Sequence, residues 1–494
     1  MRILRRLPLL SSRSAAGAIW SLLDGVVAQA LSLVVFLANT HFLPPSAFGA
    51  LATSIVLIEL IRQLVFVPVA SSINSQKTVK DSDYTVAFVI NLAVSLAVGV
   101  LLFFFSNYLD RAFTGSGLSR LALFMAASTA ILGLSTVYEA ILVRKLEFRS
   151  LAIRSIVSIA IGGASGLYLA MNGYGIWSLV WQQILQQGLS LAAIVVLTKW
   201  RPVLELDRKE FNRIVRFASH VSLNSLIGFI GYQADTITVA YFLGPRSTGL
   251  FNSAKRIGTA LNQVILKPLE RVALPTLVQF GGDLNSLKDA YLRALRITAL
   301  GTAPVFLGVA LISDDIVDLL LGTEWSGVAP VLSALAISFF GSTVMQYNSA
   351  VIMVTRQPKL QSIVNLAFVF VSLALILISV RYGIIGVACA VVIRSLVILP
   401  IQIFLVIRIV KSSFRDVSSS LAPAITASLF MGVGVALVSW KLTFSSLVFE
   451  MSVKIIIGAA IYTATLLLFF KNVILSFANS GRKLPLREGQ APLM

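Results

Sequence analysis

Long apolar runs follow one another along the whole chain, separated by short polar or basic connections. An apolar run of about 20 residues crosses a bilayer as an α-helix, whereas a barrel strand needs only about 9–11. Because the backbone must satisfy its own hydrogen bonds in hydrocarbon, runs of this length predict helices. The pattern predicts fourteen helices, near residues 16–41, 47–72, 84–108, 119–143, 151–171, 176–198, 215–242, 248–277, 290–312, 328–354, 361–380, 384–408, 422–440 and 452–471.

One stretch of the chain occurs twice. Residues 42–51 read FLPPSAFGAL, residues 242–251 read FLGPRSTGLF, and the offset between matched positions is 200 residues. The match extends outward from Asp24 and Asn224 to Pro68 and Pro268. Each copy lies between two apolar segments, so we expect a tight hairpin between two membrane helices. Such internal similarity is typical of transporters built from two related halves.

A second repeated motif supports the same division. Tyr174-Gly175-Ile176 precedes the sixth predicted helix, and Tyr382-Gly383-Ile384 precedes the twelfth. Six helices per half is an even number, so the halves insert in the same direction and are parallel repeats. The predicted parts are an N-terminal lobe 1–198, a basic linker 199–214, a C-terminal lobe 215–410, two appended helices 411–472 and a tail 473–494.

Composition agrees with an all-α polytopic membrane protein. Apolar residues make up 57% of the chain, and charged residues make up 12%. A soluble domain carries about 25% charged residues. The mean hydropathy is +0.89.

The net charge of +19 reports topology rather than a nucleic-acid partner. In a soluble protein such a charge would favour nucleic-acid binding. Here the basic residues gather at the N-terminus, in alternate connections and in the tail, while the connection 313–327 is acidic. The positive-inside rule therefore places both termini in the cytoplasm. The basic start and Ala28-Gln29-Ala30 imitate a signal peptide, but the first helix matches the seventh in the repeat and is expected to remain.

The sequence contains little that could support catalysis. The single Cys389 excludes a disulfide within one chain, and no Cys/His cluster suggests a metal site or another cofactor. The two histidines belong to no catalytic arrangement, and no connection is long enough to fold as a soluble domain. We expect a protein that is not an enzyme.

Several motifs together resemble the Wzx-type polysaccharide flippases, in the polysaccharide transporter branch of the multidrug/oligosaccharidyl-lipid/polysaccharide exporter superfamily. The residues that carry the resemblance are Leu43-Pro44-Pro45-Ser46-Ala47-Phe48-Gly49, Arg144-Lys145-Leu146-Glu147-Phe148, Gly173–Val180, Trp200-Arg201-Pro202, Asp235, Leu243-Gly244-Pro245, Gly249–Arg256 and Gly322-Thr323-Glu324-Trp325.

The resemblance implies two six-helix lobes around a central cavity that opens alternately to each side. It implies transport of an undecaprenyl-pyrophosphate-linked oligosaccharide across the bacterial inner membrane, for exopolysaccharide, capsule or O-antigen (lipopolysaccharide) synthesis. The expected partners are this lipid-linked oligosaccharide, membrane lipid and a polysaccharide polymerase or export machinery.

Basic residues inside predicted helices suit an anionic cargo. A charge at the bilayer centre costs about 2.5–3.5 kcal/mol on insertion scales, so it should face a cavity or a partner. Arg and Lys bind pyrophosphate through charge-assisted hydrogen bonds. The candidate pyrophosphate ligands are Arg62, Lys255, Arg256, Lys267 and Arg394. The alternative is internal ion pairing, for which Glu59–Arg62 and Lys267–Glu270 have suitable spacing.

Helix 8 carries most of these bases on one polar stripe. Its members recur at helical spacing: Asn252, Lys255, Arg256, Thr259, Gln263, Lys267 and Glu270. A stripe of this length is expected to face a water-filled cavity rather than lipid.

Acidic residues are candidates for ion coupling. A stripe on helix 7 contains His220, Asn224, Gly228, Gly231 and Asp235. We expect Asp235 to load a proton or bind Na⁺, with Asp24 and Glu59 as further coupling candidates. The alternative is that these carboxylates are structural, and that His220 is a solvated residue near the cytoplasmic end.

Helix 6 supplies the candidate sugar contacts. Indole faces and amides suit sugar rings, which singles out Trp181, Gln182 and Gln186.

Three other functions share parts of this pattern. A lipid II flippase has the same architecture but typically places arginines in helix 1, which here holds Asp24 and no internal base. A multidrug or cation antiporter of the superfamily favours acids in its cavity. A membrane polymerase or ligase usually carries a large periplasmic loop, and none is evident here.

Overall fold

The computed structural model describes residues 20, 24–113, 115, 117–203, 207–441 and 446–471. The predicted start of helix 1 before residue 24, apart from Trp20, and the predicted tail 473–494 lie outside the described residues. The basic residues expected at the two ends therefore also lie outside them. The side chain of Asp24 is likewise not described.

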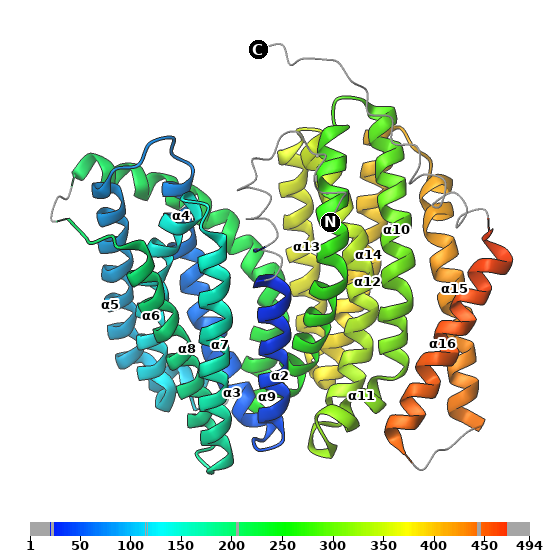
Figure 1. Ribbon diagram of the computed structural model, residues 1–494, viewed down its shortest axis with the longest axis horizontal. Helices are drawn as coiled ribbons and strands as arrows, with labels where there is room; N and C mark the ends of the chain where they lie inside the picture. The colour runs from blue at the N-terminus through cyan, green and yellow to red at the C-terminus, as the bar shows by residue number, and fades with distance from the viewer. Residues whose placement is uncertain are drawn as a thin grey trace. The chain divides into compact units, whose positions relative to one another are not determined.

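The described chain folds into helices and contains no strand (Figure 1). The first half contains η2 (Asp24–Ala28), α2 (Gln29–Thr40), α3 (Pro45–Ile61), η3 (Arg62–Phe66), α4 (Val67–Asn74), α5 (Asp81–Ala112), α6 (Leu118–Arg144), α7 (Phe148–Met171) and α8 (Ile176–Thr198). The second half contains α9 (Arg208–Gln279), α10 (Leu284–Leu311), α11 (Ser313–Leu320), η4 (Thr323–Trp325), α12 (Val328–Val354), α13 (Pro358–Ser379), η5 (Val380–Tyr382), α14 (Gly383–Val410), α15 (Phe414–Lys441) and α16 (Leu447–Phe469).

Eleven described helical segments are long and apolar enough to cross a membrane. Two of them contain two helices each: α9 breaks at Gly244, and the segment Pro358–Val410 is interrupted by η5. A further apolar helix, Gly25–Thr40, is shorter. The architecture is that of an all-α polytopic membrane protein and is consistent with the fourteen helices that the sequence predicts.

The structure differs from the predicted pattern in two connections. Helix α9 begins at Arg208 rather than near residue 215, because Glu210 and Arg213 pair one turn apart and support a solvated helical start. The acidic connection 313–327 contains α11 and η4. Asp314 and Asp315 lie in the first turn of α11, where carboxylates interact favourably with the helix dipole.

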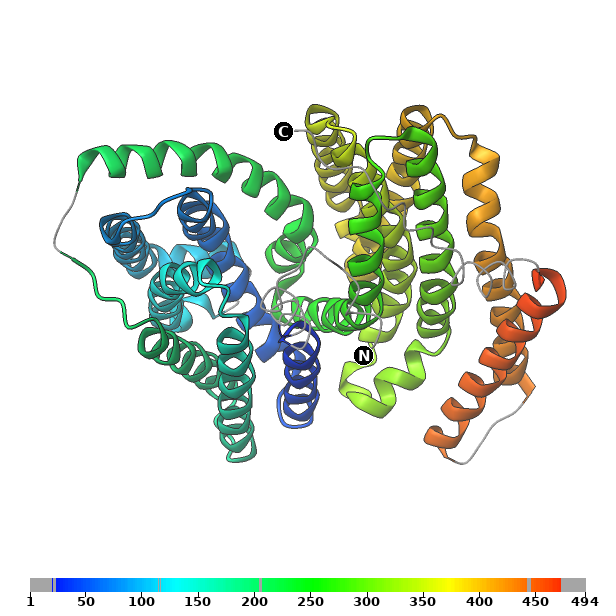
Figure 2. The ribbon, with the colours of Figure 1, turned by 45° about the horizontal axis from the view of Figure 1, so that its top comes forward.

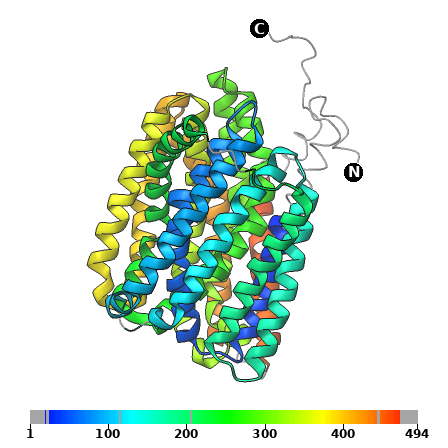
Figure 3. The same ribbon diagram turned by 90° about the vertical axis from the view of Figure 1, so that its left-hand side faces the viewer.

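The helices form two compact units, which we describe separately. The first unit comprises Met1–Lys267, Ile316–Ser338 and Pro358–Ile398, and the second comprises Pro268–Asp315, Phe339–Gln357 and Leu399–Met494. In the first unit α5 packs on α6, α7 on α8, and α6 on α8, so these helices lie side by side (Figure 3). In the second unit α10, α15 and α16 pack against one another (Figure 1). The lobe boundaries that the sequence suggests stay a prediction.

The two copies of the repeated stretch meet inside the first unit. A Cβ atom on Gly49 would lie 1.7 Å from the carbonyl oxygen of Pro245, and one on Gly249 would lie 1.8 Å from that of Pro45. These are matched positions of the repeat, so the contact is reciprocal. The backbones of α3 and α9 therefore touch where only glycine leaves room.

The second repeated motif also has one conformation in both copies. Gly175 has φ 56° and ψ −135° before α8, and Gly383 has φ 75° and ψ −163° at the start of α14. Both conformations favour glycine, which explains why each Tyr-Gly-Ile motif carries it.

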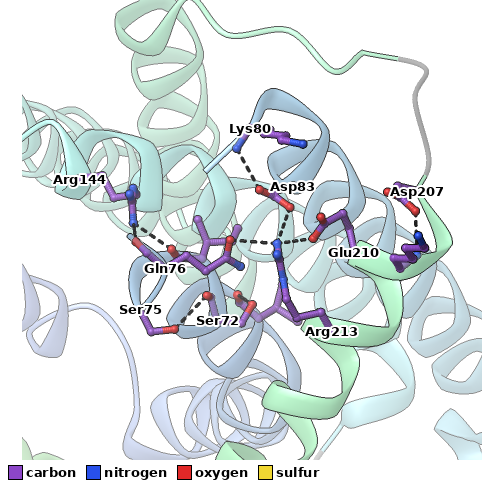
Figure 4. Close-up of polar contacts among 12 residues, drawn as sticks. Ser72, Ser75, Gln76, Lys80, Asp83, Arg144, Asp207, Glu210 and Arg213 are labelled. Carbon is purple, nitrogen blue, oxygen red and sulfur yellow. Dashed lines mark hydrogen bonds and ion pairs between the residues drawn. The ribbon is translucent and has the colours of Figure 1, made fainter. Parts of the chain in front are cut away.

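The start of α9 runs across the ends of neighbouring helices (Figure 2). Its Arg213 donates to Asp83 Oδ1 at 2.7 Å and to Gln76 Oε1 at 2.9 Å (Figure 4). Arg144, at the end of α6, donates to the carbonyl oxygens of Ile73 and Gln76, both at 2.9 Å. The connection between α4 and α5 is thus held by arginines from two other helices.

Candidate functional site

A pocket of about 240 Å³ lies in the first unit between α2, α3 and both halves of α9. Its apolar wall includes Phe36 and Phe48, whose rings stand edge to face with centroids 5.3 Å apart. Its polar wall is formed by Gln29, Gln233, Asn252, Lys255, Arg256 and Thr259. Four members of the polar stripe predicted within residues 248–277, now the second half of α9, therefore line one pocket, because residues three and four apart share a helix face.

Lys255 and Asp235 form one ion pair at this pocket. Lys255 Nζ lies 2.8 Å from Asp235 Oδ1, donates to the carbonyl oxygen of Tyr232 at 2.7 Å, and lies 4.4 Å from the centre of the Tyr232 ring. The side chains of Lys255 and Asp235 are 11% and 7% exposed. Asp235 Oδ1 also accepts a hydrogen bond from the Thr236 amide at 2.7 Å. The residue expected to bind phosphate and the residue expected to couple ions are thus direct partners.

Arg256 has a different environment. Its Nη2 donates to Ser32 Oγ at 2.8 Å and to the Ser32 carbonyl oxygen at 3.0 Å. The guanidinium carbon lies 4.6 Å from the centre of the Phe36 ring, a cation–π arrangement. No carboxylate among the described residues forms an ion pair with Arg256. A guanidinium in a pocket with only neutral partners is suited to an incoming anion.

The other candidate phosphate ligands do not line this pocket. Arg62 Nη1 donates to both carboxylate oxygens of Glu59, at 2.8 and 3.0 Å, which confirms the ion-pair alternative. Glu59 also accepts a hydrogen bond from Gln63 at 2.7 Å. Lys267 lies further along α9 and is exposed.

Arg394 lies on α14 and faces α13. Its Nη1 donates to Ser372 Oγ at 2.8 Å, and its guanidinium carbon lies 4.4 Å from the centre of the Phe368 ring. Gly231 of α9 approaches the same helix, because a Cβ atom there would lie 3.2 Å from Val369. Of the two glycines on the stripe predicted for residues 215–242, Gly231 therefore lets α13 come close, whereas nothing lies within 4 Å of a Cβ atom added to Gly228.

The structure does not bring the three candidate sugar contacts together. Trp181 is 57% exposed. Gln182 Oε1 accepts a hydrogen bond from Asn39 Nδ2 at 3.3 Å. Gln186 lines a second pocket, formed by other helices of the first unit.

His220 is exposed, and its Nδ1 lies 2.7 Å from the carbonyl oxygen of Arg216. This agrees with the expectation of a solvated residue.

Sequence reasoning missed Ser32, Phe36 and Tyr232, which surround the two bases. Ser32 and Phe36 lie four residues apart on α2, so a helix face shared by a hydroxyl and an aromatic ring was the available signal.

Comparisons with known proteins agree with this architecture. The family model described as "Polysaccharide biosynthesis protein" matches residues 37–330. The chain is 25% identical over 320 residues to the succinoglycan biosynthesis transport protein ExoT of Rhizobium meliloti (strain 1021), a match that covers 65% of each chain. It is 22% identical over 334 residues to the lipopolysaccharide biosynthesis protein WzxC of Escherichia coli (strain K12), covering 66% of this chain and 67% of that protein.

A solved structure shows the fold. The lipid II flippase MurJ in an inward closed conformation superposes with a TM-score of 0.74 at 16% identity, over 93% of this chain and 99% of that one. The chain matches about 65% of the length of ExoT, so the likeness to that protein is a partial one. The family model spans more than half of the chain and includes α3, the first copy of the repeat and the bases of α9. The chain therefore belongs to the polysaccharide biosynthesis protein family, as its motifs predict.

Proposed function

We propose that the protein is an alternating-access flippase for an undecaprenyl-pyrophosphate-linked oligosaccharide used in exopolysaccharide, capsule or O-antigen synthesis. Membership of the family supports this, as do the names of two relatives, a biosynthesis transport protein and a lipopolysaccharide biosynthesis protein. The single observation that carries the proposal is Arg256. It lines a pocket with one polar and one apolar wall and has neutral partners from α2.

The pyrophosphate occupies the pocket between Arg256 and Lys255. Arg256 offers a planar donor group suited to two phosphate oxygens, and Lys255 adds a second positive charge. To bind the cargo, Lys255 exchanges Asp235 Oδ1 for a phosphate oxygen, so cargo binding releases the carboxylate. Removing one partner of a buried pair leaves an uncompensated charge, so Asp235 then requires a cation.

This exchange gives a route for coupling. Once Lys255 turns to the cargo, Asp235 takes up a proton or Na⁺, and loss of that ion returns Lys255 to Asp235 and expels the phosphate. In one conformation of the transporter Lys255 is paired with Asp235, and in the other it is paired with the cargo phosphate. The cargo therefore binds the two conformations with different affinities, which a ligand-driven conformational change requires. Asp24 remains a second coupling candidate. Glu59 is a weaker one, because Arg62 and Gln63 already hold it.

The multidrug or cation antiporter is less well supported as an alternative. Two basic side chains in the pocket oppose a cationic drug, since like charges in low dielectric repel. The lipid II flippase MurJ has the same fold and, by its name, lipid II as its cargo. The cargo sugar therefore distinguishes it from our proposal.

We further propose that the protein lies in the bacterial inner membrane with both termini in the cytoplasm, where it delivers substrate to a polysaccharide polymerase or export machinery. Within this scheme it is not an enzyme, binds no nucleic acid, and uses binding and conformational change alone.

Deletion of the gene tests the proposal. One secreted polysaccharide should be lost while its lipid-linked repeat unit accumulates inside the cell. The wild-type gene and an Arg111→Ala control, an exposed arginine of α5, should restore export, whereas Arg256→Ala should not. Normal polysaccharide together with loss of drug resistance would favour the antiporter instead.

A further inference from the structure

A second pocket, of about 250 Å³, lies among η3, α6, α7 and α8 of the first unit. Every residue that lines it is polar or charged except Leu132. Polar side chains on membrane helices must find partners or face water, so this lining is suited to a polar ligand. Nothing in the pyrophosphate exchange uses it.

Arg154 of α7 is the least satisfied charge in this pocket. Its side chain is 12% exposed, and its Nη2 lies 3.9 Å from Glu139 Oε1, at the outer limit of an ion pair. Its Nε is buried and has no hydrogen-bond partner among the described residues. Glu139 is 47% exposed, so it can turn to water and leave the guanidinium to another carboxylate. A buried arginine in this state gains from an anionic partner.

Neutral donors and acceptors surround this arginine. The side chains of Gln183 and Gln186 line the pocket and make no hydrogen bond with another described residue, whereas Gln187 Oε1 accepts one from Ser128 Oγ at 2.7 Å. A Cβ atom on Gly162 would lie 2.8 Å from Gln186 Cβ, so close packing of α7 on α8 fixes the position of this glutamine. Free amides and serine hydroxyls are matched by the hydroxyl groups of a sugar ring.

We propose that this pocket binds one sugar ring of the cargo, and that the ring carries a carboxylate. Arg154 takes the carboxylate, and Gln183 and Gln186 take ring hydroxyls. The cargo is then an acidic oligosaccharide with at least one uronic acid or similarly carboxylated sugar. The inference rests on the proposed function and names its substrate class.

Charge distinguishes this site from the pyrophosphate pocket, which has a similar volume. Ligand pockets for drug-sized molecules have about 300–1,000 Å³, so this smaller pocket suits one ring rather than the whole oligosaccharide. Arg62 at its rim is already neutralised by Glu59. One under-paired guanidinium fits one carboxylate, whereas the more highly charged pyrophosphate fits the pocket with Lys255 and Arg256.

The test uses purified full-length protein in proteoliposomes and two synthetic cargoes on the same undecaprenyl pyrophosphate. The cargoes differ only in one sugar, a hexose in one and the corresponding hexuronic acid in the other. The wild type should transport the acidic cargo faster. Arg154→Gln should lower the acidic-to-neutral rate ratio about tenfold, the effect of losing one hydrogen bond to a charged group. Arg154→Lys should recover part of the ratio, and the exposed control Arg111→Gln should leave it unchanged.

The outcomes separate the two claims. Equal wild-type rates for both cargoes, or an unchanged ratio in Arg154→Gln, would overturn the acidic-sugar site while leaving the flippase intact. A parallel fall of both rates in Arg154→Gln would also overturn it, because that pattern indicates a structural arginine. Failure of the wild type to move either cargo would contradict the proposed function itself.

Discussion

At the scale of single residues, the charged side chains within the helices differ in how far they are enclosed and in which partners they have. Asp235 and Lys255 are nearly enclosed and partner each other, while Arg256 relies on a serine and an aromatic ring. Arg62 and Glu59 form a pair of similar length, but their side chains are 40% and 25% exposed. Enclosure rather than distance therefore separates the pair that matters for stability from the one that does not.

Single substitutions in the enclosed pair should destabilise the protein more than their joint removal does. Asp235→Asn or Lys255→Met alone leaves one buried charge without a partner, a loss of about 3–5 kcal/mol. The double variant Asp235→Asn/Lys255→Met removes both charges and should regain most of this stability. Thermal unfolding of the purified variants in detergent measures it. Glu59→Gln at the more open pair is the control and should cost at most about 1 kcal/mol. Single variants as stable as the wild type would contradict the enclosed pair.

At the scale of elements, the crossing of α3 and α9 joins the two copies of the repeat. Gly49 meets the backbone of Pro245, and Gly249 meets that of Pro45. Thr53 and Ser253, again matched positions, each donate to the carbonyl oxygen of the glycine four residues earlier, at 2.9 and 2.7 Å. The repeat is thus preserved in the geometry of the crossing as well as in the sequence.

Alanine at either glycine should force the two helices apart. A methyl group less than 2 Å from a carbonyl oxygen cannot be accommodated by side-chain movement, so Gly49→Ala and Gly249→Ala should lower both stability and transport. Gly228→Ala, in the first half of α9, is the control, since nothing lies within 4 Å of its added atom. There alanine should be neutral or stabilise by about 0.5–1 kcal/mol. Thermal unfolding and a transport assay on the three variants decide between a tight crossing and a loose one.

Most elements could be predicted from the sequence because long apolar runs identify membrane helices. The predicted ranges 176–198 and 328–354 coincide with α8 and α12. The start of α9 was predicted too late because residues 208–214 are mostly charged and polar, and their helix is held by pairs such as Arg213–Asp83. That contact joins residues far apart in the chain, so no local pattern contains it.

The candidate site shows the same limit. Helical spacing correctly grouped Lys255, Arg256 and Thr259 on one wall, because such spacing is a local property. Helical spacing could not show that Lys255 pairs with Asp235 or that Arg256 donates to Ser32, because both contacts depend on how separate helices pack. It likewise could not show that Gln186 lines a pocket while Trp181 is exposed.

At the scale of the whole molecule, the asymmetry of positive charge should fix the orientation in the membrane. Reporter fusions within residues 199–216 and at the C-terminus should report a cytoplasmic location, and fusions within 313–327 a periplasmic one. A paired reporter, active only on one side of the membrane, provides the control at each site. A periplasmic signal from the 199–216 fusion would contradict two lobes inserted in the same direction.

Transport by the reconstituted protein tests the central claim most directly. Proteoliposomes with undecaprenyl-pyrophosphate-linked oligosaccharide in one leaflet should show its movement to the other, driven faster by an imposed proton or Na⁺ gradient. Arg256→Ala should slow this movement about tenfold or more, the loss expected for a hydrogen bond to a charged group, and Arg256→Lys should recover only part of it. Arg111→Ala should transport at the wild-type rate. Movement of the cargo at an unchanged rate by Arg256→Ala would contradict an account in which this partly buried arginine holds the pyrophosphate.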